Sequence, residues 1–164
     1  MTTLFQPDEL NPNDPAEFLY TLSAAYLDHT AQISDEEMAY LNDEQHTLTA
    51  YCYLDSQVQE GGFVQLIAAG YGEYIFLNPV ADSLRRWQIK PTPKILDKAK
   101  TLYAKYGQEI EQLAEADTPL DDIRAKFAGF EELDGGYYEA ADEDMAAAVA
   151  YVQANWEKFA VIKD

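Results

Sequence analysis

The sequence predicts an all-α protein, a compact single-domain bundle of about seven to nine helices. Apolar residues recur at three- and four-residue spacing along most of the chain, no stretch alternates apolar and polar residues as a half-buried strand does, and capping signals precede most periodic segments. The 164 residues suit one domain, and a hydrophobic content of 48% suits a folded core despite a formal net charge of -19. We expect an irregular N-terminal arm over residues 1–13 and a single helical domain over residues 14–164.

Capping signals and chain breaks delimit the expected helices in the first half of the chain. Asp14-Pro15 begins a helix that ends near Thr30, and Ser34 begins a second one. A third helix runs through Leu48 and Val58 to a pair of glycines. A short buried helix is expected over residues 63–69, followed by an aromatic-rich connection that is read as a loop or helix rather than a strand.

Proline and glycine mark the second half in the same way. Asn78-Pro79 repeats the cap-then-proline signal, and Thr92 is expected to cap a longer helix with Pro93 at its first position. Thr118-Pro119 opens another helix. We expect Asp134-Gly135-Gly136 to break the chain before a last helix from about Asp142 to Phe159.

The stretch Gly61-Gly62-Phe63 separates two helical segments. Paired glycines could form a phosphate-binding turn, but Glu60 precedes them and no Lys or Arg lies within twenty residues on either side. Glycine also allows positive φ, which is how helices commonly end. We therefore interpret Gly61, Gly62 and Phe63 as a structural turn that folds two helices onto the Phe63 ring.

Charge is distributed unevenly along the sequence. Residues 1–84 hold 14 acids and no Lys or Arg, residues 85–105 hold seven bases and one acid, and residues 106–164 hold 15 acids and four bases. The basic segment is expected to act as a counterweight inside the protein or at a dimer contact. Free nucleic acid and anionic membranes would be repelled by the rest of such a surface, so neither is an expected partner.

The acids fall in clusters that favour the helix faces opposite the apolar stripes. Helical carboxylates three or four residues apart recur about every 5 Å along the axis, and DNA carries a phosphate about every 3.4 Å per strand. Such rows can present a phosphate-like potential to a basic protein, although a solvated acidic face is their usual meaning. The candidate contact residues are Asp28, Asp35, Glu36, Glu37, Asp43, Glu44, Glu131, Glu132, Asp134, Glu139, Asp142, Glu143 and Asp144.

The sequence offers little for catalysis, and we expect no enzymatic activity and no metal site. Asp43 and His46 have the spacing of half a di-metal helix motif, but no second histidine partner is visible. Cys52 lies on an apolar helix face and is expected to be a buried structural thiol, so no disulfide forms within the chain. Without a signal peptide or an apolar run of membrane-spanning length, a cytoplasmic location is expected.

A longer motif carries a family resemblance. The run Leu54-x-x-Gln57-Val58-x-x-Gly61-Gly62-Phe63-x-Gln65 is followed by Asn78 and by Tyr137-Tyr138 before an acidic last helix. Over roughly residues 20–160 the chain resembles a bacterial family of DNA-mimic proteins once classed as a domain of unknown function, and in particular the mimic that binds a helix-turn-helix transcription factor. The resemblance implies a helical fold, a homodimer, no cofactor, and an acidic surface that blocks the DNA-binding face of the regulator.

The predicted function is thus DNA mimicry directed at a basic helix-turn-helix regulator. Two alternatives stay open. An acidic chaperone or assembly factor would bind many basic proteins with little preference, and a small helical metal-binding enzyme would be built around His46 and neighbouring carboxylates.

Overall fold

The structure is a computed structural model, and it describes residues 1–31 and 41–162. This part of the chain is an all-α domain with eight α-helices, which confirms the predicted fold class. The expected helix from Ser34 lies outside the described residues. The helical elements are α1 (Pro15–Ala31), α2 (Asp43–Ala68), α3 (Gly72–Phe76), α4 (Val80–Arg86), α5 (Pro91–Glu115), α6 (Leu120–Lys126), a 3₁₀ turn η2 (Ala128–Phe130), α7 (Glu131–Ala154) and α8 (Trp156–Ala160).

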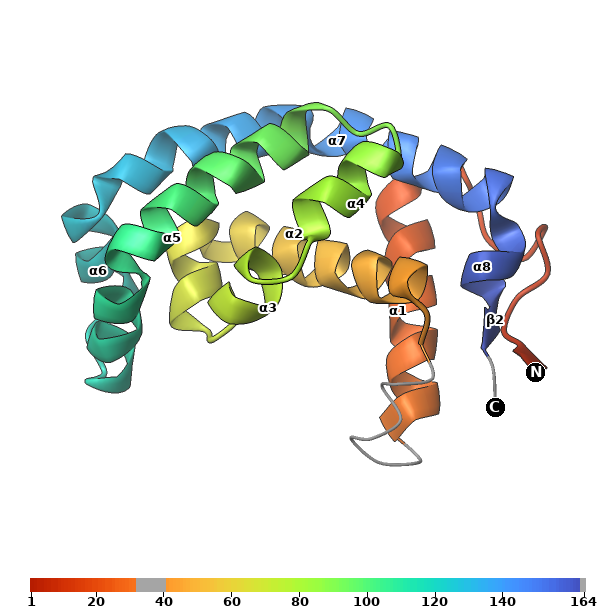
Figure 1. Ribbon diagram of the computed structural model, residues 1–164, viewed down its shortest axis with the longest axis horizontal. Coiled ribbons are helices and arrows are strands. Elements are labelled where there is room, and N and C mark those ends of the chain that lie inside the picture. Colours follow the sequence, from red (N-terminus) through yellow and green to blue (C-terminus); the bar gives the residue numbers. More distant parts are fainter. Residues whose placement is uncertain (32–40, 163–164) are drawn as a thin grey trace.

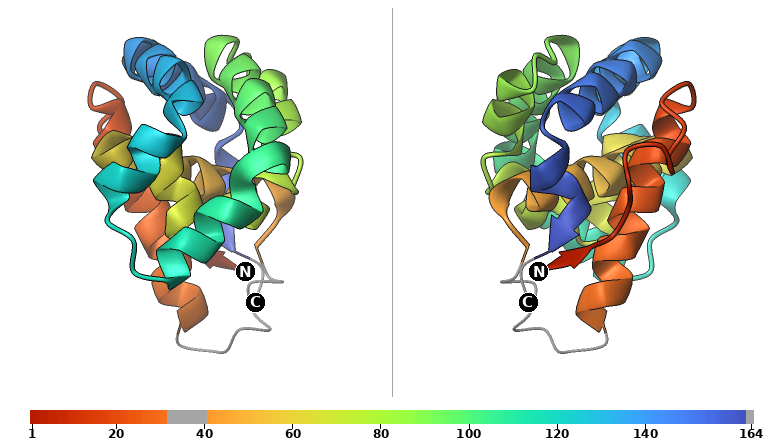
Figure 2. Two further views of the ribbon diagram at one scale, coloured as in Figure 1. Left: turned by 90° about the vertical axis from the view of Figure 1, so that its left-hand side faces the viewer. Right: turned by 90° about the vertical axis from the view of Figure 1, so that its right-hand side faces the viewer.

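Three long helices form the body of the domain. Helices α5 and α7 lie side by side and both pack on α2, while α1 packs across α2 and α7 (Figure 1). Figure 2 shows α5 and α7 as one layer above α2. The two ends of the described chain meet in a short antiparallel ladder that the sequence did not predict, in which β1 (Thr2–Thr3) pairs with β2 (Val161–Ile162). No helix among the described residues is long and apolar enough to cross a membrane.

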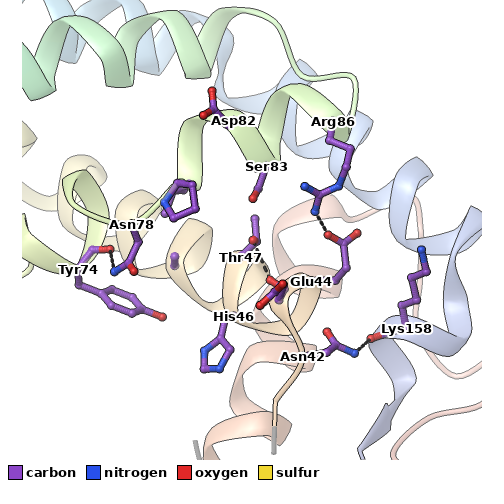
Figure 3. A pocket seen from close by; sticks show the side chains of 14 residues that line it. Asn42, Glu44, His46, Thr47, Tyr74, Asn78, Asp82, Ser83, Arg86 and Lys158 are labelled. Carbon is purple, nitrogen blue, oxygen red and sulfur yellow. Dashed lines mark hydrogen bonds and ion pairs between the residues drawn. The ribbon is translucent and has the colours of Figure 1, made fainter. Parts of the chain in front are cut away.

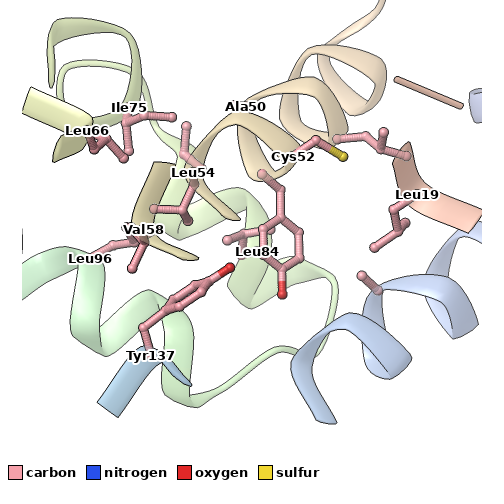
Figure 4. Close-up of a cluster of buried hydrophobic side chains, with 14 of the residues drawn as sticks. Leu19, Ala50, Cys52, Leu54, Val58, Leu66, Ile75, Leu84, Leu96 and Tyr137 are labelled. Atoms are coloured by element: carbon pink, nitrogen blue, oxygen red, sulfur yellow. The ribbon is translucent and has the colours of Figure 1, made fainter. Parts of the chain in front are cut away.

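Aromatic and aliphatic side chains from all the long helices fill the core (Figure 4). Phe63 is fully buried, and its ring lies edge-on to Tyr137 with centroids 6.4 Å apart. Cys52 is also buried, and burial raises the pKa of its thiol to about 12. These observations confirm that Phe63 anchors the turn and that Cys52 is a structural thiol.

The expected break at Asp134-Gly135-Gly136 is wrong, because α7 continues through it to Ala154. Each helical glycine costs about 1 kcal/mol relative to alanine. Packing offsets this cost: Leu133, Asp134 and Tyr137 are buried around the glycine pair. The helix ends instead at Asn155, whose φ of -127° and ψ of 37° separate α7 from α8.

The expected cap at Thr92 is also wrong. Helix α5 begins two residues earlier than expected, at Pro91, with Lys90 in the cap position. The Thr92 side chain is buried within the first turn, where its backbone N–H and its hydroxyl both donate to the Asp144 carboxylate of α7. A carboxylate from a distant part of the sequence therefore satisfies this helix start.

Candidate acidic interaction surface

The exposed side of α7 carries five carboxylates, which we call the α7 acidic face: Glu131, Glu132, Glu139, Asp142 and Glu143. At 3.6 residues per turn and 1.5 Å per residue, these positions share an arc of about 120° and span about 18 Å of the helix. All five were among the predicted contact residues. The structure therefore places them on one face of a single helix, in two groups separated by about 10 Å between Glu132 and Glu139.

Three other predicted contact residues point into the protein. Glu44, Asp134 and Asp144 are only 8%, 5% and 4% exposed, so the expectation that they contribute to an acidic surface is wrong. Buried carboxylates must be hydrogen-bonded or paired to offset the cost of desolvation. Each of the three accepts hydrogen bonds from elements far away in the sequence.

Asp134 binds the kink inside α2. At the kink Gly62 has a φ of +80°, and the next backbone N–H, that of Phe63, donates to Asp134 Oδ1 over 2.8 Å. A Cβ on Gly62 would lie 2.3 Å from Asp134 Oδ2, so only glycine fits. Burial raises the pKa of Asp134 above its usual value, while the Phe63 N–H and Arg124 act in the opposite direction.

The predicted Gly61-Gly62-Phe63 turn is thus confirmed as a break in helical geometry, with φ and ψ outside the helical region at both glycines. The structure adds what the sequence could not show: the turn also binds an anion, and that anion is a side chain of the same chain. The N–H groups at the start of a helix favour negative charge. Asp134 supplies this charge to the second half of α2.

Asp144 accepts hydrogen bonds at the start of α5, as Asp134 does at the start of the second half of α2. Its Oδ2 lies 3.0 Å from the Thr92 nitrogen and 2.5 Å from the Thr92 hydroxyl oxygen. Ten residues apart on α7, Asp134 and Asp144 therefore stabilise the starts of two different helical segments. These two bonds fix α7 against both α2 and α5.

Asp55 of α2 is a buried carboxylate that the sequence analysis missed. It accepts a hydrogen bond of 2.6 Å from each of two hydroxyls, those of Tyr20 on α1 and Tyr137 on α7. Desolvation and the Asp55 carboxylate raise the pKa of both tyrosines, which keeps them protonated as donors. One signal was present: Asp55 lies on the apolar stripe of its helix, between Leu54 and Val58.

The remaining predicted contact residues are not part of the α7 acidic face. Asp28 is exposed on α1, and Asp43 is exposed at the first position of α2. Asp35, Glu36 and Glu37 lie outside the described residues. The structure brings together five of the thirteen predicted acids.

The basic segment has two different roles. Arg85 pairs with Asp82 and Asp97, and Arg86 pairs with Glu44, so two of the seven bases, both at the surface, neutralise acids of the same chain. The lysines are exposed and form no ion pair among the described residues: Lys90, Lys94, Lys98, Lys100 and Lys105. Four of them lie in the N-terminal part of α5, which packs beside α7, whereas Glu109, Glu111 and Glu115 follow in its C-terminal part.

Asp43 and His46, which have the spacing of half a di-metal motif, are not joined by further metal-ligating side chains among the described residues. Within residues 1–31 and 41–162, no group of three or more His, Cys, Asp or Glu side chains is arranged to hold a metal ion. Asp43 and His46 instead line an open cleft between α2 and α4.

Comparison with known proteins agrees with this architecture. The family model for DMP19-like proteins matches residues 39–155, which include the kinked α2 and all of α7. A protein named "DNA mimic protein DMP19", from Neisseria meningitidis serogroup B (strain ATCC BAA-335 / MC58), is 58% identical over 162 residues, covering 99% of this chain and 98% of that protein. The chain therefore belongs to the DMP19-like protein family.

Proposed function

We propose that this protein is a DNA mimic that binds a basic DNA-binding protein and prevents it from binding DNA. The α7 acidic face carries the proposal, because it holds five exposed carboxylates on one helix. The name of the 58% identical relative supports the same function. The partner that best fits the proposal is a helix-turn-helix transcription factor, blocked at the surface that binds its operator.

The packing of α7 supports a fixed charge array. Its inner side is held by the bonds from Phe63 to Asp134 and from Thr92 to Asp144. The Tyr138 hydroxyl donates to the Val58 carbonyl oxygen over 2.6 Å and adds a third contact, to α2. An array that is already ordered loses little conformational entropy on binding.

Energetically, the proposal depends on summation. A single exposed ion pair contributes about 0–1 kcal/mol, so five such pairs together contribute at most about 5 kcal/mol, or roughly a 4000-fold effect on affinity. Exposed charges are screened over about 10 Å at 0.1 M salt. Binding should therefore weaken steeply as salt is added.

The proposal includes a homodimer and a binding role without catalysis, in the cytoplasm. Helix-turn-helix regulators bind two half-sites as dimers. A dimeric mimic would present two acidic faces to such a partner, one for each recognition helix. Light scattering coupled to size-exclusion chromatography measures the mass of the protein and of its complex.

A charge-neutralised variant tests the proposal directly. In the first variant, all five residues of the α7 acidic face are replaced by Gln or Asn. A matched control makes the same change in charge at five exposed acids elsewhere: Asp8, Glu17, Glu60, Glu115 and Glu157. After the partner is captured from lysate, its binding to each variant is measured between 50 and 500 mM salt, in competition with operator DNA.

We expect the α7 variant to lose most of its affinity and most of its salt dependence, whereas the control changes little. Equal losses in both variants would show that only net charge matters, and would favour a chaperone-like binder of many basic proteins. A complex in which the regulator still binds its operator would disprove mimicry.

A further inference from the structure

Three lysines of α5 form a row of positive charge on the outer side of that helix. They are Lys94, Lys98 and Lys105, which we call the α5 lysine row, and all three are exposed. At 3.6 residues per turn and 1.5 Å per residue, these positions share an arc of about 40° and span about 16 Å of the helix. The buried side chains of α5, such as Leu96 and Ala99, lie on the opposite side. The row therefore faces away from the core.

The α5 lysine row runs alongside the acidic part of α7. Thr92 bonds Asp144, and Ile95, further along α5, is the side chain nearest to Gly136, earlier on α7. The two helices are therefore antiparallel, and Lys98 lies beside the N-terminal part of α7. Packed helices lie about 8–10 Å apart, and exposed charges act over about 8 Å at physiological salt. A partner bound to the α7 acidic face therefore also meets the row.

The α5 lysine row has no ion-pair partner in the described part of the chain. Asp97, the sequence neighbour of Lys98, pairs instead with Arg85. Arg86 pairs with Glu44, as Figure 3 shows. The chain holds 30 acids and only 11 bases, so acids are plentiful. Neutralisation within the fold therefore does not explain the row.

Mimicry of DNA does not explain the row either. A DNA duplex presents only negative phosphates. A row of cations beside a phosphate-like surface repels a protein that is basic throughout, and it attracts a protein whose basic surface has acidic side chains next to it. Opposed like charges suppress wrong partners, while complementary charges fix the register of the right one. A partner of mixed charge therefore suits both helices at once.

We propose that the α5 lysine row binds acidic side chains that flank the basic surface of the DNA-binding partner. This inference rests on the proposed mimicry and adds the chemistry that selects the partner. The α7 acidic face contacts the basic surface, and the row contacts the acidic side chains beside it. The row thus orients the partner and rejects proteins that are uniformly basic.

Two synthetic helical peptides test this selection. Both carry the same lysines on one face, and the adjacent face holds glutamates in the mixed peptide and glutamines in the basic peptide. Net charge alone predicts that an acidic protein binds the basic peptide more tightly. The proposal predicts the reverse order for the unaltered protein, by about threefold, in calorimetric titrations at 50 mM salt.

Paired variants assign the preference to the row. Replacing both Lys94 and Lys98 by Gln should reverse the order, so that the basic peptide binds more tightly. Replacing both Lys100 and Lys158 by Gln makes the same change in net charge at exposed lysines outside the row. Lys100 lies at least about 120° around α5 from Lys94 and Lys98, and Lys158 lies on α8. This control should keep the preference for the mixed peptide.

The inference is overturned if the unaltered protein prefers the basic peptide, or if the row variant keeps the preference for the mixed one. A row variant whose mass by light scattering differs from that of the unaltered protein also overturns it, because the row would then be a contact between copies of this chain. Neutralising the α7 acidic face should weaken the binding of both peptides. If that variant binds both as tightly as the unaltered protein, the proposed mimicry itself fails.

Discussion

The inner and outer sides of α7 carry the same carboxylate chemistry in opposite surroundings. On the outer side, neighbours such as Glu143 are exposed and form no ion pair among the described residues. On the inner side, Asp134 and Asp144 are buried and accept hydrogen bonds from the starts of other helical segments. The difference shows that one helix can supply both the proposed binding charge and the contacts that hold this charge in place.

The largest expected effect comes from the glycine against which Asp134 packs. Gly62→Ala introduces a Cβ 2.3 Å from the Asp134 carboxylate at a φ of +80°, so the free energy of unfolding should fall by about 3 kcal/mol or more. Gly135→Ala on α7 is the matched control, since its Cβ meets no atom within 4 Å and the helix should gain about 1 kcal/mol. Urea unfolding measures both. Equal effects would mean that Asp134 does not constrain the kink.

The next largest expected effect on the free energy of unfolding comes from Asp144, compared with its neighbour Glu143. Asp144→Ala leaves the buried Thr92 N–H and hydroxyl without their acceptor, which should cost about 2–3 kcal/mol of unfolding free energy. Glu143→Ala, one residue away on the exposed side, should change it by less than about 0.5 kcal/mol. Thermal and urea unfolding of the two variants compare the sides of α7 directly. A Glu143 variant as unstable as the Asp144 variant would contradict the distinction.

The smallest effect is a pH dependence at Asp134. Its folded-state pKa is raised by burial, so the folded protein holds this proton more tightly than the unfolded chain does. The resulting stabilisation is present at low pH and is lost as pH rises from the ordinary value of 3.8 through the raised pKa. Asp134→Asn keeps an acceptor for the Phe63 N–H but cannot titrate.

The unfolding free energy of the unaltered protein relative to Asp134→Asn should therefore decrease as pH rises through that interval. Urea unfolding at a series of pH values measures the difference, and Glu132→Gln controls for the loss of one surface charge. A difference that is constant with pH, or that grows with it, would show that the pKa of Asp134 is not raised.

Local signals in the sequence were enough for most of the helices and for the turn at Gly61-Gly62. Capping residues, prolines and apolar periodicity act over a few residues, so a linear reading detects them. The break at Gly135-Gly136 was wrongly predicted because the interactions that decide it join residues far apart in the sequence. A glycine pair reads as a break locally, and only packing between α7 and its neighbours keeps this one helical.

For the candidate acidic surface too, the sequence identified the acidic residues, but only the tertiary structure showed which of them are buried. The sequence named the five carboxylates of the α7 acidic face but could not separate them from Glu44, Asp134 and Asp144, because all eight have the same chemistry and similar local context. Asp55 was missed because its partners, Tyr20 and Tyr137, are 35 and 82 residues away.

By itself the sequence determined the helical class, the acidic character, the turn at Phe63 and the family resemblance. These depend on composition and on interactions between residues close together in the chain. The tertiary structure alone decided which acids face solvent and which are buried against another helix. A carboxylate becomes a surface charge or an internal cap according to the donors that folding brings to it, and here those donors come from 35 to 82 residues away.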